Sequence, residues 1–177
     1  MQIHTEPHNT SYFKTGLWWK IVLSVIVFLG LGTLSGFSTM SAIEGWYADL
    51  TKPSFTPPNW IFGPAWTILY VLMGGSFGII WQVAAKGRYP IMVKFAKRGL
   101  LLFGVHFLLN LAWTPLFFGL HRTGWALLVI VLLIIMIALL IRHFFRLDRL
   151  AAFLLIPYLL WVVFATALNI GILVLNS

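Results

Sequence analysis

Five long apolar runs restrict the fold of this chain more than any other feature. Hydrophobic residues make up 60% of the 177 residues and charged residues only 9%, whereas an ordinary soluble domain is about a quarter charged. The runs lack the alternation typical of outer-membrane β-strands, and each can form a helix of about 20 residues that crosses a bilayer. We therefore predict an all-α integral membrane protein with a bundle of five transmembrane helices, at residues 17–40, 60–84, 99–118, 124–145 and 150–175.

Beyond the apolar runs, we expect the chain to consist of an N-terminal tail and a single membrane domain. Residues 1–16 are polar and without periodicity, so we expect a tail outside the bundle. The first apolar run is longer than the hydrophobic region of a signal peptide, about 7–15 residues, which favours a retained helix. Residues 17–177 then form a single five-helix membrane domain. Between the second and third runs, Pro90 and the charged residues around it are expected to form a connection rather than a helix.

The Lys and Arg residues predict an orientation. When the chain is followed through five spans, ten of its twelve basic residues fall on the side of the N-terminus, and only Lys52 and Arg122 on the other. Positive residues collect on the cytoplasmic side of membrane proteins, so we predict a cytoplasmic N-terminus and an external C-terminus. The net charge of +8 then reflects topology and contact with anionic lipids of the bilayer. Nucleic acid is not expected as a partner.

The sequence offers little for metal or acid–base chemistry. It has no cysteine and four carboxylates, Glu6, Glu44, Asp49 and Asp148, all outside the apolar runs. Ion-coupled transporters usually keep ionisable groups at membrane depth, and here only His106 is a candidate. We expect no metal site, no cofactor and no ion-coupled transport.

The connection between the first two runs is long and aromatic. It carries Trp46, Tyr47, Phe55 and Trp60, with three prolines between positions 53 and 58. Proline neither continues a helix nor donates a backbone hydrogen bond. This segment is therefore predicted to be an ordered, extended loop that covers a cavity in the bundle.

Three runs place aromatic and polar residues on a single helical face. An apolar pocket with a few polar groups suits a flat hydrophobic ligand. Alternatives stay open, because Trp and Tyr also favour membrane interfaces, buried Asn residues also join helices, and His106 also fits a satisfied core position. The faces consist of Phe62, Ala65, Trp66 and Leu69; of His106, Asn110, Trp113 and Phe117; and of Tyr158, Trp161, Ala165, Leu168 and Asn169.

Local signals add detail to the expected bundle. The turn at residues 119–124 makes the third and fourth helices antiparallel neighbours. Asp148 can cap the fifth helix, whereas Pro115 and Pro157 should bend the helices that contain them. Gly-x-x-x-Gly pairs at positions 32/36 and 74/78 permit close helix contacts.

The motifs of the loop and of the aromatic faces resemble the signature of the TspO/MBR family. The agreement covers most of residues 30–172 and four of the five runs. The matching segments are Trp46-Tyr47, Lys52-Pro53-Ser54-Phe55-Thr56-Pro57-Pro58, Gly63-Pro64-Ala65-Trp66, Leu109-Asn110-Leu111-Ala112-Trp113-Thr114-Pro115-Leu116-Phe117-Phe118-Gly119, Gly124-Trp125-Ala126, Pro157-Tyr158-Leu159-Leu160-Trp161, Phe164-Ala165 and Leu168-Asn169.

The resemblance implies a five-helix bundle, often a homodimer, with a pocket beneath the first loop that binds porphyrins such as protoporphyrin IX and other flat hydrophobic ligands. It also implies residence in a bacterial cytoplasmic membrane. Residue by residue, the resemblance implies a ligand site formed by Trp46, Tyr47, Phe62, Ala65, Trp66, Asn110, Trp113, Trp161, Ala165 and Leu168.

The resemblance leaves three functions open. The protein is a porphyrin-binding sensor, scavenger or carrier, an enzyme that degrades porphyrin with light and oxygen, or a facilitated tetrapyrrole transporter. For the enzyme, the resemblance places Trp66 and Trp161 as the reactive residues.

At two places the sequence departs from the family pattern, and these places concern cholesterol recognition and the dimer interface. The segment after Leu168-Asn169 lacks the Tyr and the basic residue of the animal cholesterol motif. Leu101 and Val105 replace the small residues through which some relatives dimerise.

Overall fold

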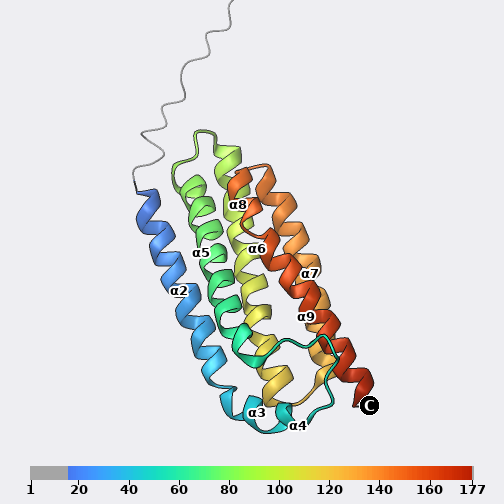
Figure 1. Cartoon of the computed structure of the whole chain (residues 1–177). Coiled ribbons are helices and arrows are strands. Elements are labelled where there is room, and N and C mark those ends of the chain that lie inside the picture. The colour runs from blue at the N-terminus through green and yellow to red at the C-terminus, as the bar shows by residue number, and fades with distance from the viewer. Residues whose placement is uncertain (1–15, 177) are drawn as a thin grey trace, which may run out of the picture.

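The computed structural model describes residues 16–176, and these form a bundle of five long helices (Figure 1). All five are long and apolar enough to cross a membrane. The described residues contain no strand, and the predicted all-α five-helix bundle is confirmed. The long helices are α2 (Leu17–Phe37), α5 (Phe62–Lys86), α6 (Pro90–Thr114), α7 (Thr123–Phe145) and α9 (Ile156–Leu175). Shorter elements are α3 (Met40–Glu44), α4 (Trp46–Asp49), α8 (Arg149–Phe153), the 3-10 helix η1 (Asn59–Ile61) and the π-helical turn η2 (Pro115–Gly119).

The chain passes up and down through the bundle. Helix α5 packs against both α2 and α6, α6 packs against α7, and α7 packs against α9. The predicted turn after α6 is present, since only residues 120–122 separate η2 from α7. Of the predicted tail, residues 1–15 lie outside the described part of the chain, as does Ser177.

Helix α6 begins nine residues earlier than predicted. Pro90 occupies its first turn, where a missing N–H breaks no helical hydrogen bond. The prediction that Pro90 belongs to the connection between the second and third helices was therefore wrong. The connection shrinks to residues 87–89, and Lys94, Lys97 and Arg98 stand on the helix itself. Their long side chains reach the solvent from helical positions.

Prolines also mark the start of α9 and the end of α6. Pro157 lies in the first turn of α9, and α8 ends at Phe153, whose carbonyl Pro157 cannot bond. The expected kink is thus a break between two helices. Asp148 caps α8 as predicted, because its Oδ1 accepts a hydrogen bond from the Ala151 N–H at 2.9 Å. At Pro115, α6 changes into the π-helical turn η2.

Two glycines of α5 bring α2 into backbone contact. A Cβ added at Gly74 would lie 2.6 Å from Val25 Cα, and one at Gly78 would lie 2.7 Å from Ile21 Cα. These contacts confirm the close helix packing that the Gly-x-x-x-Gly pair predicts. Near the other end of α2, a Cβ at Gly36 would meet no atom within 4 Å. Open space therefore remains beside Gly36 near that end of α2.

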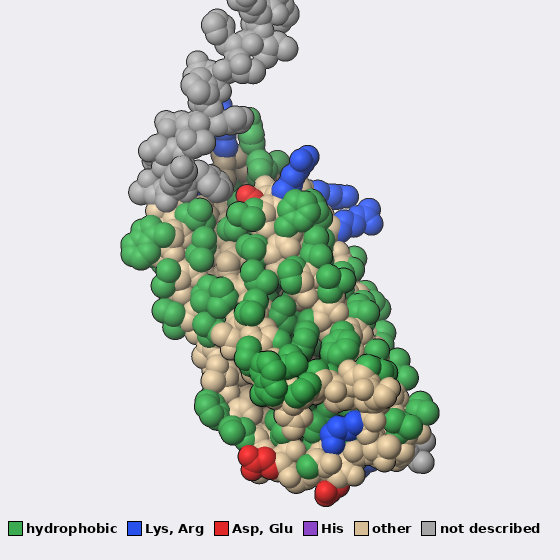
Figure 2. Space-filling view, in the orientation of Figure 1, with side chains coloured by type: hydrophobic (Ala, Val, Ile, Leu, Met, Phe, Trp, Pro, Cys, Tyr) green, Lys and Arg blue, Asp and Glu red, His purple; other side chains and the backbone are tan. Residues whose placement is uncertain are grey.

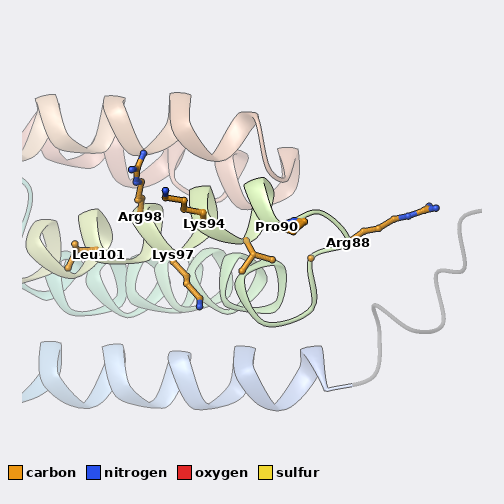
Figure 3. A pocket seen from close by; sticks show the side chains of 8 residues that line it. Arg88, Pro90, Lys94, Lys97, Arg98 and Leu101 are labelled. Carbon is orange, nitrogen blue, oxygen red and sulfur yellow. The ribbon is translucent and has the colours of Figure 1, made fainter.

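Basic side chains gather at the end of the bundle where α2 begins (Figure 2). There, four of them line a shallow groove of about 590 Å³ beside the start of α6, namely Arg88, Lys94, Lys97 and Arg98 (Figure 3). Lys52 and Arg122 lie in the connections at the opposite end. This opposite end contains the candidate site.

Candidate functional site

A cavity of about 370 Å³ lies between the helices at the end where α3 and α4 cross the bundle. Ligand pockets usually measure about 300–1,000 Å³, so the size fits a small molecule or one edge of a larger one. The walls come from α2, α3, α4, η1, α5, α6, η2 and α9 and from the connection between α2 and α3. The lining residues are Gly32, Thr33, Gly36, Phe37, Thr39, Met40, Ile43, Tyr47, Asn59, Phe62, Gly63, Trp66, Thr67, Tyr70, Trp113, Thr114, Phe117, Phe118, Trp161, Ala165, Leu168, Asn169 and Ile172.

The cavity opens between α2 and α5. Its lining residues Phe37 on α2 and Gly63 and Thr67 on α5 are exposed, whereas Asn169 and Ile172 on α9 are buried. These exposures place the open side of the cavity between α2 and α5, and α9 forms the inner wall.

Aromatic pairs from the long helices form flat walls. Trp66 stacks on Tyr70, one turn further along α5, with ring centroids 5.4 Å apart. Trp113 stacks on Phe117 at 5.1 Å, and Trp161 of α9 meets the edge of the Phe62 ring at 5.9 Å. Such pairs are worth about 0.5–1.5 kcal/mol each beyond burial of their surface. The geometry offers broad π-faces to a planar ligand.

A buried polar network supports the Tyr70 wall from behind. The Tyr70 hydroxyl donates to Asn110 Oδ1 at 3.3 Å, and Asn110 Nδ2 donates to the Tyr158 hydroxyl at 3.0 Å. His106 Nε2 lies 3.0 Å from the same hydroxyl. His106 is therefore a core histidine that is hydrogen-bonded through Nε2. The fully satisfied position of the alternative interpretation is not shown, because Nδ1 has no hydrogen-bond partner among the described residues.

The connection after α2 folds over the cavity as a partly helical lid. Trp46 and Tyr47 lie in the short helix α4, so the prediction of an extended loop was wrong for them. After α4, the chain is tied to α9: Thr51 N–H donates to Asn176 Oδ1 at 3.0 Å, and Asn176 Nδ2 donates to the Thr51 carbonyl at 2.9 Å. Tyr47 is buried against the cavity, and this burial raises the pKa of its hydroxyl. The hydroxyl thus remains a neutral donor at physiological pH.

Seven of the ten residues expected in the ligand site line the cavity. Trp46 does not, because its ring stacks on His121 at 4.2 Å, and Ala65 is half-buried on α5 outside the lining. Asn110 lies behind the wall in the polar network. The seven are Tyr47, Phe62, Trp66, Trp113, Trp161, Ala165 and Leu168.

Sequence reasoning missed the contribution of α2 and α3. Apart from Phe37, their lining residues are not aromatic, as at Gly32, Met40 and Ile43, so these helices carry no aromatic stripe. The pair Gly32 and Gly36 was the available signal, since a Cβ at Gly32 would overlap the Tyr70 ring. Tyr70 itself follows Trp66 by four residues and could have been found from helical spacing.

A model of the TspO/MBR family matches residues 23–175. The chain belongs to the TspO/MBR family. The matched range includes every lining residue of the cavity and its lid.

Curated relatives come from archaea, bacteria and animals. The chain is 39% identical over 158 residues to the tryptophan-rich protein TspO of Archaeoglobus fulgidus, covering 89% of this chain and 97% of the relative. It is 32% identical over 158 residues to the tryptophan-rich sensory protein of Cereibacter sphaeroides, covering 89% and 92%. It is 38% identical over 124 residues to the translocator protein of Homo sapiens, covering 70% of each chain.

Proposed function

We propose that this membrane protein binds porphyrins, such as protoporphyrin IX, and similar flat hydrophobic ligands, and acts as a sensor, scavenger or carrier. The observation that supports this function best is the cavity under the lid, whose walls are stacked aromatic pairs contributed by separate helices. A planar macrocycle would exchange contact with water and lipid for contact with these π-faces.

The charge of the lining suggests how a porphyrin would enter. Among residues 16–176, those that line the cavity include no Lys, Arg, His, Asp or Glu. An ionised carboxylate buried there would lose its hydration without gaining a charged partner. The apolar edge of the macrocycle should therefore face α9, while its carboxylates stay at the mouth between α2 and α5.

Titration of the purified protein with protoporphyrin IX in the dark tests this proposal. Several tryptophans line the cavity, so binding should quench tryptophan fluorescence in a saturable way. Trp18 is 70% exposed at the far end of α2, and Trp18→Phe is the matched control, which should retain the affinity of the unmodified protein. Absence of saturable quenching would contradict the proposal.

Light-driven degradation of the bound porphyrin is the second candidate function. It is favoured by the position of Trp66 and Trp161, two readily oxidised side chains that both line the cavity. In residues 16–176, no three His, Asp or Glu side chains lie where they could hold a metal ion.

A Trp66→Phe, Trp161→Phe double variant separates binding from degradation. We expect it to bind protoporphyrin IX through the remaining apolar contacts but to lose most of the oxygen-dependent loss of absorbance under light, with product mass as a second readout. Bleaching at the unmodified rate by a variant that still binds would leave a passive binder.

We further propose that the N-terminus faces the cytoplasm of a bacterial cell and that the cavity opens on the outer side. The concentration of basic residues at the far end of the bundle supports this orientation. Because the chain has no cysteine, single cysteines placed at Ser54 and Arg88 can be labelled from either side. Labelling of the Arg88 position alone from outside intact cells would reverse the assignment.

A further inference from the structure

Asn169 is a buried polar side chain that the proposed function leaves unexplained. It lies on the inner wall of the cavity and is 1% exposed. Neither its amide nitrogen nor its amide oxygen has a hydrogen-bond partner among the described residues. Leaving a buried polar group unpaired costs about 1–3 kcal/mol, so this position calls for a partner that enters the cavity.

A second unpaired donor lines the same cavity. Trp113 Nε1 is buried and also lacks a hydrogen-bond partner in the described part of the chain. Indole nitrogen only donates, and the Asn169 amide both donates and accepts. Both unpaired groups belong to residues that line the cavity, so a ligand whose inserted edge carries an acceptor would supply the missing partner.

The acceptor must be uncharged. The described part of the chain places no cationic side chain in the lining, so an ionised carboxylate at Asn169 would be buried without a counter-charge from it. A carbonyl oxygen of a ketone, ester or carboxamide accepts the same hydrogen bond without this penalty. A carboxamide would in addition donate to Asn169 Oδ1.

We infer that Asn169, assisted by the Trp113 indole N–H, is a specificity-determining residue that selects ligands with a neutral carbonyl group on the edge inserted into the cavity. The inference rests on the proposed function and extends it. It means that the cavity distinguishes tetrapyrroles by the polarity of the edge opposite their carboxylates, in addition to their flat shape.

A matched pair of porphyrins tests the inference. Mesoporphyrin IX and 2,4-diacetyldeuteroporphyrin IX carry the same two carboxylates, and differ in that ethyl groups on the opposite edge are replaced by acetyl groups of similar size. The unmodified protein should bind the diacetyl porphyrin about 5- to 10-fold more tightly, which corresponds to one neutral hydrogen bond. The carbonyl stretching frequency of the bound ligand should fall as the hydrogen bond forms.

Three variants test whether the preference for the diacetyl porphyrin comes from Asn169 and Trp113. Asn169→Leu keeps the size of the side chain but removes its polar atoms, and should bring the ratio of the two dissociation constants close to 1 and restore the carbonyl frequency. Trp113→Phe keeps a ring on the wall and should reduce the ratio in part, whereas the distant Trp18→Phe variant should keep it in full.

The outcomes are distinct. Equal affinity of the unmodified protein for the two porphyrins, or a preference that persists in Asn169→Leu, overturns the inference while leaving porphyrin binding in place. Failure of both porphyrins to bind overturns the proposed function and the inference with it. If Asn169→Leu does not fold, a ratio of 1 in the unmodified protein still overturns the inference, and a reduced ratio in Trp113→Phe still supports it.

Discussion

The two ends of the bundle are built on opposite principles. At the basic end, Gly74 and Gly78 let α2 approach α5 to backbone contact, and Met73 and Ile80 beside them are fully buried. At the other end, stacked aromatic rings stand between the helices and a cavity remains. Small residues therefore close the interface, and large planar residues that brace one another hold it open.

Helix α5 takes part in both arrangements. Its first turns carry Phe62, Trp66 and Tyr70 on the cavity side, and its later turns carry the glycines that contact α2. We infer that stability depends mainly on the basic end and ligand binding on the cavity end. Substitutions at the two ends should then separate folding from affinity.

The largest effect is expected at the glycine contact. In Gly74→Leu, the new Cβ alone would lie 2.6 Å from the backbone of α2, so the helices must move apart. Overpacking of this kind typically costs about 1–3 kcal/mol, and a backbone obstacle places this variant near the upper limit. Unfolding in detergent, by temperature or by SDS titration, measures the loss.

Gly30→Leu is the matched control, because Gly30 lies on α2 with no atom within 4 Å of an added Cβ. It should change the unfolding free energy little. Equal destabilisation by the two variants would show that the contact with α2 is not the stabilising feature.

A cavity-filling substitution should show the reverse pattern. Ala165 lines the cavity one turn after Trp161, and Ala165→Phe puts a ring where the ligand would lie. We expect protoporphyrin IX affinity to fall at least tenfold, equivalent to about 1.4 kcal/mol, with a smaller change in unfolding free energy. A folded Ala165→Phe protein with full affinity would remove Ala165 from the site.

The polar network behind the Tyr70 wall should have an intermediate effect. Tyr158→Phe removes the hydroxyl that both Asn110 and His106 contact, which leaves buried polar atoms unpaired. The unfolding free energy should fall by about 1–2 kcal/mol. Tyr89→Phe, at an exposed tyrosine, is the control, and similar losses in both would argue against a structural network.

The smallest effect is expected at the attachment of the lid. Asn176→Ala removes the paired hydrogen bonds to Thr51, which are exposed and worth about 0.5–1 kcal/mol together. Bound porphyrin should dissociate faster, by a few-fold, in stopped-flow experiments. An unchanged dissociation rate would mean that the lid does not retain the ligand.

The sequence predicted the cavity wall better than it predicted the lid. Helical spacing alone places Trp66 and Trp161 on inward faces, because a helix fixes which residues share a side. The position of Trp46 depends on a contact with His121, which is 75 residues away along the chain and adopts a positive φ of 55°. No local pattern encodes such a contact.

The residue at which a helix starts can likewise depend on contacts that no local sequence pattern encodes. Pro90 is compatible with a connection and with the first turn of a helix, and the basic residues after it are compatible with both. Only the packing of α6 against α5 and α7 decides in favour of the helix. Likewise, the participation of α2 in the cavity depends on where α5 holds it, which the apolar sequence of α2 does not reveal.

Equilibrium titration of two wall variants with protoporphyrin IX tests the central claim most directly. Tyr47→Ala and Trp161→Ala remove aromatic rings that line the cavity from the lid and from α9. Each should weaken binding by about 1–3 kcal/mol if its ring contacts the ligand, while thermal unfolding confirms that the variants are folded. Unchanged affinity in both folded variants would contradict the assignment of this cavity as the porphyrin site.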